Sequence, residues 1–89
     1  MLISDEAAGA LRKYGANAQM DQTIEECAEL IVALRHYRRG KATEQDVLGE
    51  LADVVIMVDQ MTMHFGAQQF ADVYREKLAK LRRRMEADQ

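Results

Sequence analysis

The chain has 89 residues and a mass of 10.1 kDa, with 48% hydrophobic residues and neither proline nor tryptophan, a composition that excludes disorder and indicates one small, soluble, all-α domain over residues 1–89. The formal net charge of −3 argues against a nucleic-acid-binding module, and no apolar run approaches the roughly 18 residues of a membrane span. The single cysteine and the absence of a secretion signal favour the reducing cytoplasm.

Two helices are predicted in the first half of the chain. Ser4 is a candidate N-cap for a helix that runs to Lys13 or Tyr14, where Gly15 supplies a left-handed stop. A longer helix is expected from about Asn17 to the basic residues before Gly40, because apolar side chains recur there at alternating steps of four and three. The stripe comprises Met20, Ile24, Cys27, Ile31 and Leu34.

Two further helices follow the turn at Gly40. Thr43 is an expected N-cap with Asp46 as its capping-box partner, and Gly66 is expected to end this third helix. A fourth helix is predicted from about Gln68 to Met85. The apolar stripe of the third helix contains Val47, Leu51, Val54, Val58, Met61 and Phe65, of which the first four define the expected core, and the apolar stripe of the fourth contains Phe70, Val73, Tyr74, Leu78 and Leu81.

The short turn makes the second and third helices an antiparallel hairpin. We therefore predict a four-helix bundle-like protomer built around that hairpin. The third helix is also apolar off its core face, at Ile56 and Met63, which predicts a second buried face. Because a domain of this size buries only about 60 to 65% of its unfolded surface, we expect a homo-oligomer, and a homodimer interface is the simplest explanation of the second apolar face.

Four carboxylates form two helical pairs, Glu26 with Glu29 and Glu50 with Asp53, each pair spaced by three residues and so lying on one face of its helix. Glu29 lies eleven residues before Gly40 and Glu50 ten after it, so the hairpin places them at similar height. Acidic pairs alone are more often solvated surface groups that pair with Lys or Arg.

If the four carboxylates converge, they raise one another's pKa values unless cations compensate. Oxygen-only ligands favour Mg²⁺ or Mn²⁺ over zinc, and magnesium commonly bridges a few carboxylates and substrate phosphates. A di-iron bundle requires Glu-x-x-His pairs, and neither His36 nor His64 follows a Glu by three. The pattern thus favours a hard-metal site that handles a phosphate-containing substrate.

Six of the twelve Lys and Arg residues lie between Arg75 and Arg84. Within this segment Lys77, Lys80 and Arg84 share a helical face and are candidates for binding a polyphosphate. A solvated helix end, favoured by the helix dipole, explains the same cluster equally well.

The run E-E-C-A-E at residues 25–29, followed twenty residues later by E-L-A-D at 50–53, resembles the E-E-x-x-E…E-x-x-D signature of MazG-like all-α nucleoside triphosphate pyrophosphohydrolases. The resemblance covers roughly Tyr14 to Arg84. It implies a Mg²⁺-dependent enzyme that hydrolyses nucleoside triphosphate to monophosphate and pyrophosphate with a metal-activated water, and subunits that form dimers or dimers of dimers. Its implied metal ligands are Glu26, Glu29, Glu50 and Asp53, and Glu25 matches the first acid of the signature, with a supporting or base role.

Two alternatives to this function stay open. One is phosphoribosyl-ATP pyrophosphohydrolase activity, a variant of the same chemistry on a related fold. The other is a non-catalytic helical oligomerisation or interaction module, in which the acids are remnants or salt-bridge partners. Binding of Mg²⁺ or Mn²⁺, with or without nucleotide, separates an enzyme from the second alternative.

Overall fold

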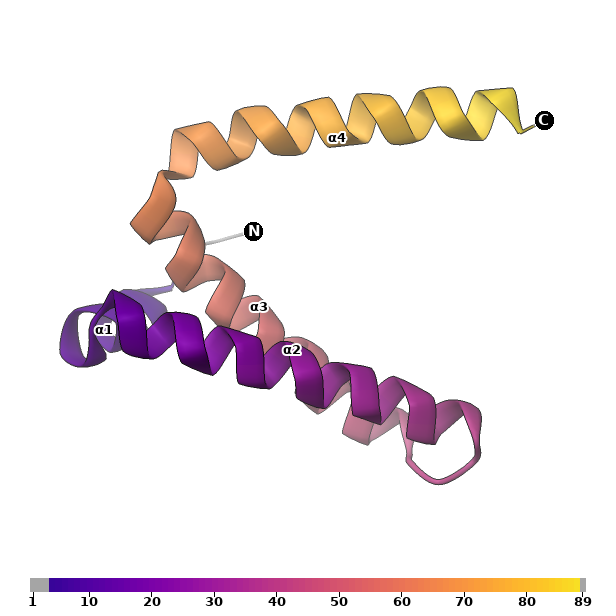
Figure 1. Ribbon diagram of the computed structural model, residues 1–89, viewed down its shortest axis with the longest axis horizontal. Coiled ribbons are helices and arrows are strands. Elements are labelled where there is room, and N and C mark those ends of the chain that lie inside the picture. The colour runs from indigo at the N-terminus through magenta and orange to yellow at the C-terminus, as the bar shows by residue number, and fades with distance from the viewer. Residues whose placement is uncertain (1–3, 89) are drawn as a thin grey trace.

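A computed structural model describes residues 4–88, so positions 1–3 and 89 of the expected single domain lie outside the described part. Four α-helices follow one another along the chain (Figure 1): α1 (Asp5–Tyr14), α2 (Ala16–Arg38), α3 (Glu44–Phe65) and α4 (Ala67–Ala87). The described residues contain no β-strand. The predicted all-α class is confirmed, and the helix bounds differ from the expected ones by at most two residues.

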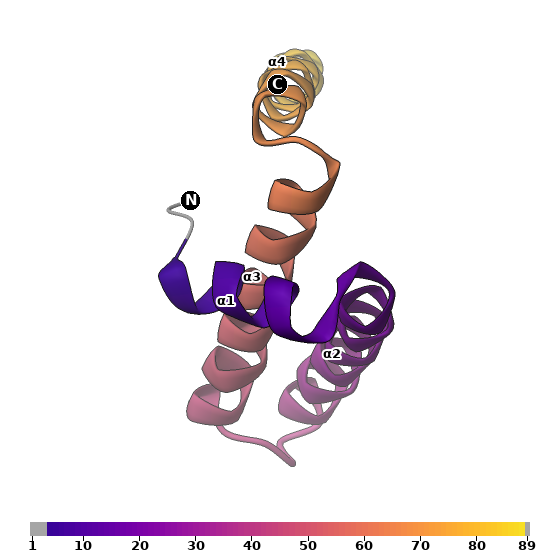
Figure 2. The same ribbon diagram turned by 90° about the vertical axis from the view of Figure 1, so that its left-hand side faces the viewer.

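The helices α2 and α3 contact each other and form the antiparallel hairpin; α2 lies in front of α3 in Figure 1, and the two lie side by side in Figure 2. Gly40 has a φ of 73°, which glycine adopts without strain, and it turns the chain directly after α2. The predicted capping box then starts α3. The Thr43 backbone N–H donates to Asp46 Oδ2 at 2.8 Å, and the Asp46 N–H donates to Thr43 Oγ1 at 3.1 Å. The Thr43 backbone N–H, followed by the Thr43 side chain, holds the pKa of the Asp46 carboxyl group below its usual range.

The short helix α1 crosses the hairpin and contacts both α2 and α3 (Figure 2). Ser4 caps it as expected, because its Oγ accepts the Ala7 backbone N–H at 3.0 Å, and Gly15 ends it with a φ of 88°. Ala7 is buried, and so are Met57 and Gln60 of α3. The most enclosed part of the protomer therefore lies around the C-terminal half of α3.

After Gly66, with a φ of 122°, the chain turns and α4 extends away from the hairpin (Figure 1). Within the described residues α4 contacts α3 and no other helix. The radius of gyration is 15.6 Å, whereas a compact chain of this length has about 12 Å. The protomer is therefore elongated, with one long helix largely outside the body of the fold.

The predicted apolar stripes are only partly buried in the protomer. Val47, Val54 and Val58 are partly covered between the helices, as expected for a core, but Leu51 is exposed. The stripe of α2 is mostly exposed, with Ile24 at 69%. Two helices that pack as a hairpin bury only the surface between them, and carboxylate residues occupy part of that surface. The prediction of a core within the protomer is therefore wrong for Leu51 and for most of α2, and Phe65 and the apolar stripe of α4 are exposed as well.

Candidate metal centre

Three carboxylates converge where α2 faces α3. Glu26 and Glu29 lie one turn apart on α2, and Glu50 faces them from α3. One carboxylate oxygen from each residue lies within 4.8 Å of the other two. The hairpin register therefore brings together residues that are more than twenty positions apart in the sequence.

Two of these side chains hold oxygen atoms without partners. Glu26 Oε1 accepts a hydrogen bond from Gln22 Nε2 at 2.7 Å, one turn earlier on α2, which orients the carboxylate. Its other oxygen, Oε2, is buried and accepts no hydrogen bond from the described residues, and the same is true of Glu50 Oε2. Buried carboxylate oxygens are costly without a partner. These two atoms are free to ligate a cation.

The pKa of the third carboxylate, Glu29, is raised by the two neighbouring acids. The negative charge of Glu26 is the largest cause that raises the pKa of Glu29, followed by burial and by the charge of Glu50. Like charges in close proximity disfavour the ionised form. A divalent cation would remove this repulsion, and an all-oxygen donor set suits Mg²⁺ or Mn²⁺. The residues present therefore fit the hard metal that the sequence pattern predicts.

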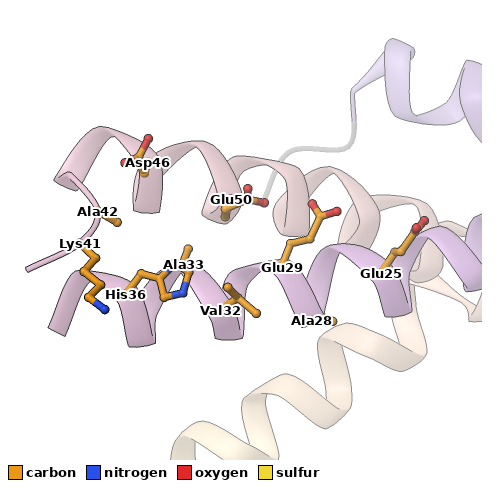
Figure 3. A pocket seen from close by; sticks show the side chains of 10 residues that line it. All are labelled: Glu25, Ala28, Glu29, Val32, Ala33, His36, Lys41, Ala42, Asp46 and Glu50. Atoms are coloured by element: carbon orange, nitrogen blue, oxygen red, sulfur yellow. The ribbon is translucent and has the colours of Figure 1, made fainter. Parts of the chain in front are cut away.

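The other predicted acids lie beside this cluster. Glu25 is exposed and lines the same groove as Glu29 and Glu50 (Figure 3). Asp53 is exposed too, one helical turn beyond Glu50, and it is not among the three residues whose oxygens converge. The metal-ligand role of Asp53 therefore stays a prediction.

The predicted phosphate-binding cations lie elsewhere. Lys77, Lys80 and Arg84 are exposed on α4, which does not contact α2. Figure 1 shows that the C-terminal part of α4 points away from the hairpin. The structure therefore does not bring these three residues to the carboxylates of their own protomer.

Sequence reasoning missed two basic side chains that share a groove with the carboxylates. His36 and Lys41 line the groove that contains Glu29 and Glu50, at its other end (Figure 3). His36 follows Glu29 by seven residues, which is two helical turns, so the spacing was a usable signal. Lys41 had no such signal, because its position depends on the conformation of the turn between the helices.

The fold and the site together define a class: an all-α protein whose helical hairpin carries a cluster of converging carboxylates. A family model, the MazG nucleotide pyrophosphohydrolase domain, matches residues 15–87. This match covers most of the chain, and the protein therefore belongs to the MazG nucleotide pyrophosphohydrolase family. No curated protein and no solved structure matches the chain significantly.

Family membership supports a nucleotide pyrophosphohydrolase in general terms, a hydrolase that depends on a metal ion. The matched range contains α2, α3, α4 and all the predicted site residues, whereas α1 lies outside it. Among the described residues no helix is long and apolar enough to span a bilayer.

Proposed function

We propose that this protein is a Mg²⁺-dependent hydrolase that converts nucleoside or deoxynucleoside triphosphates to monophosphates and pyrophosphate. One observation carries the proposal within the MazG family: Glu26 and Glu50 face each other across the hairpin, each with a buried oxygen that lacks a hydrogen bond. A metal bound by these atoms has the remaining coordination positions available for water and phosphate oxygens. The groove beside them provides the space for a substrate, with a volume of about 530 Å³.

The residues of the hairpin have distinct proposed roles. Glu26, Glu29 and Glu50 hold the metal, with Asp53 as a further ligand, and Gln22 orients Glu26 through their hydrogen bond. Mg²⁺ or Mn²⁺, when bound, offsets the charge of the phosphates and activates water for attack. The water oxygen bonds to the α-phosphorus, the bond from that phosphorus to the bridging oxygen breaks, and the electron pair leaves with pyrophosphate. Glu25, exposed beside Glu29, takes the proton of the water.

Self-association is a second part of the proposal. The chain exposes 7034 Å², whereas a compact protein of this mass exposes about 5,300 Å². The surplus of about 1,700 Å² is roughly twice what each partner contributes to a typical stable interface, about 800 Å². The exposed apolar side chains of the hairpin include Ile24, Ile31, Leu34, Leu48, Leu51 and Val55, and those of α4 include Phe70, Val73, Tyr74, Leu78, Leu81 and Met85.

These side chains leave the acidic groove free. Helical spacing places Leu34 on the side of α2 opposite Glu25 and Val32, which line the groove, and Ile31 about 100° to 120° around the helix from them. A homodimer that buries the apolar side of the hairpin and the stripe of α4 therefore leaves the carboxylates open to substrate. We propose a homodimer as the basic unit, with a tetramer as the larger alternative, and the reducing cytoplasm as its setting.

A dimer can also place Lys77, Lys80 and Arg84 near a substrate bound to the other subunit. Within one protomer they lie on a helix that does not contact α2. A helix that extends from one subunit onto its partner carries its cations to the partner's hairpin. We therefore propose that these three side chains contact the phosphates bound by the neighbouring subunit.

The test of the activity is a panel of nucleoside and deoxynucleoside triphosphates incubated with the full chain and Mg²⁺. We expect equal amounts of monophosphate and pyrophosphate, and we expect Glu50→Gln to abolish their release. Glu76→Gln, an exposed position on α4 with the same change of charge, is the matched control and retains activity. Release of inorganic phosphate alone, or full activity of Glu50→Gln, contradicts the proposal. Inactivity together with an absence of Mg²⁺ and Mn²⁺ binding in calorimetry favours a non-catalytic module instead.

A further inference from the structure

The groove beside the carboxylates continues along the hairpin as far as the turn between α2 and α3 (Figure 3). One end holds Glu25, Glu29 and Glu50, and the other end holds His36 and Lys41. Val32 and Ala33 form the groove wall between these ends, with Ala28 at the carboxylate end and Ala42 beside Lys41 at the turn (Figure 3). The groove therefore joins a candidate cation site to a pair of basic side chains.

Hydrogen bonds in the turn fix the backbone position of Lys41. Its backbone N–H donates to the His36 carbonyl oxygen at 2.8 Å, directly after the positive φ of Gly40. Two residues later the capping box of Thr43 and Asp46 anchors the start of α3. The backbone of Lys41 is thus held from both sides, and only its flexible stem has to be ordered when a ligand binds.

The charge of Lys41 has no counterion in the described part of the chain. No carboxylate oxygen lies within 4.0 Å of its ammonium group there, since the one ion pair present joins Arg75 to Asp72. Asp46 lines the same end of the groove, but its Oδ2 already accepts the Thr43 N–H at 2.8 Å. An anion in the groove therefore meets an ammonium group that no side chain has neutralised.

Chemistry and distance favour a phosphate at this end over a nucleobase. Seven residues separate Glu29 from His36, a distance of about 10 Å along the helix axis, and the lysine stem shortens the remaining gap. A nucleobase prefers an aromatic platform, and Phe, Tyr and Trp are absent from the residues that line the groove. An ammonium group and an imidazole N–H instead suit phosphate oxygens.

We propose that Lys41, with His36 beside it, binds the β- and γ-phosphates of the substrate, which become the pyrophosphate leaving group. This inference rests on the proposed function. When the bond between the α-phosphorus and the bridging oxygen breaks, pyrophosphate gains negative charge, and the Lys41 ammonium neutralises it. The nucleoside then extends from the carboxylate end of the groove, away from the turn.

The experiment measures binding of inorganic pyrophosphate and of nucleoside monophosphate to the full chain by calorimetry in the presence of Mg²⁺. We expect Lys41→Gln to weaken pyrophosphate binding about tenfold or more, because one charge-assisted hydrogen bond is lost, and to leave monophosphate binding unchanged. Lys41→Arg retains most of the pyrophosphate affinity. Arg39→Gln is the matched control: it removes one charge from the same turn at a residue outside the groove lining, and it leaves both affinities unchanged.

Three results overturn the inference: absence of pyrophosphate binding to the wild-type chain, equal pyrophosphate affinity of wild type and Lys41→Gln, or a larger loss of monophosphate than of pyrophosphate affinity. The third result places the nucleoside at this end. Turnover assays separate the inference from the proposed function. If wild type hydrolyses triphosphates and Lys41→Gln has unchanged pyrophosphate affinity, KM and kcat, only the inference fails. If wild type hydrolyses none of them but pyrophosphate binding depends on Lys41, only the proposed function fails.

Discussion

Glu26 on α2 and Glu50 on α3 face each other across the hairpin, and the Oε2 atom of each is buried without a hydrogen-bond donor among the described residues. In other parts of a protein, such atoms would carry a penalty for lost hydration. A cation between the helices converts the same arrangement into a stabilising one. The metal-free hairpin therefore sacrifices stability at the position where the metal is expected to bind.

This relationship predicts a metal-dependent stability. Mg²⁺ at about one hundred times its Kd should raise the free energy of unfolding of the wild type by about 2.7 kcal/mol. In Glu50→Gln the metal effect should be absent, and the metal-free variant should be at least as stable as the metal-free wild type, because a neutral amide replaces a crowded carboxylate. Urea unfolding with EDTA and with Mg²⁺ measures both quantities. An equal Mg²⁺ effect on the two proteins would contradict the assignment of Glu50 as a ligand.

The raised pKa of Glu29 predicts a dependence of stability on pH in the absence of metal. The folded protein holds this proton to a higher pH than the unfolded chain does. The contribution of this proton to stability is therefore fully present below the ordinary pKa of a glutamate, and it is lost as pH rises from that value through the raised folded pKa. Glu29→Gln should therefore unfold with a weaker dependence on pH across the interval, measured by urea denaturation in EDTA. Glu76→Gln, on α4, should retain the wild-type dependence.

The exposed stripe of α4 predicts that single apolar positions control assembly. Leu78→Glu should shift the protein from dimer to monomer, because Leu78 is 47% exposed in the protomer and lies on the apolar stripe. Ala79→Glu is the matched control: it introduces the same side chain on the opposite side of the helix and should leave the dimer intact. Light scattering after size-exclusion chromatography reports the mass. A monomeric wild type, or equal effects of the two variants, would be evidence against an interface on this stripe.

The placement of Lys77, Lys80 and Arg84 on α4 predicts a site shared between subunits. A triple variant with glutamine at these positions and the Glu50→Gln variant should each be inactive alone. When the two are unfolded together and refolded as a mixture, hybrid dimers contain one site with an intact hairpin from one chain and an intact α4 from the other. We therefore expect partial recovery of activity.

Recovery in this mixing experiment is specific to contacts between subunits. If the cations act within their own chain, every site in a hybrid lacks either Glu50 or the cations, and activity stays absent. The same two variants refolded separately and then combined without exchange of subunits serve as the negative control. Full activity of the triple variant alone would remove the three residues from the proposed site.

Local signals in the sequence predicted the helices well. Gly15, Gly40 and Gly66 each adopt a positive φ at a helix boundary, and Thr43 forms the expected capping box. Two helices begin one residue earlier than expected, α2 at Ala16 rather than about Asn17 and α4 at Ala67 rather than about Gln68. Capping and glycine conformation involve hydrogen bonds and torsion angles within a few residues, so a short stretch of sequence contains all the information they need.

Periodicity was less informative about burial. It showed correctly that Ile24, Ile31 and Leu34 share one face of α2, but that face is exposed in the protomer. A periodic repeat of apolar residues predicts which side chains share a helix face, but it does not predict which helix or subunit packs against that face. Whether this apolar face is buried depends on the direction of α4 and on the contacts between subunits. Both are set by residues far apart in the sequence or on another chain.

The sequence by itself determined four helices, a tight antiparallel hairpin and two acidic pairs, each on one face of its helix, because spacing, caps and turns act over short distances along the chain. Only the tertiary structure decided that Glu26, Glu29 and Glu50 converge while Asp53 lies outside that group. It also decided that α4 leaves the hairpin with its cations, and that Lys41 lies at the end of the same groove. These features follow from the rotation of one helix against another and from the conformation of connecting turns, which depend on packing between distant residues.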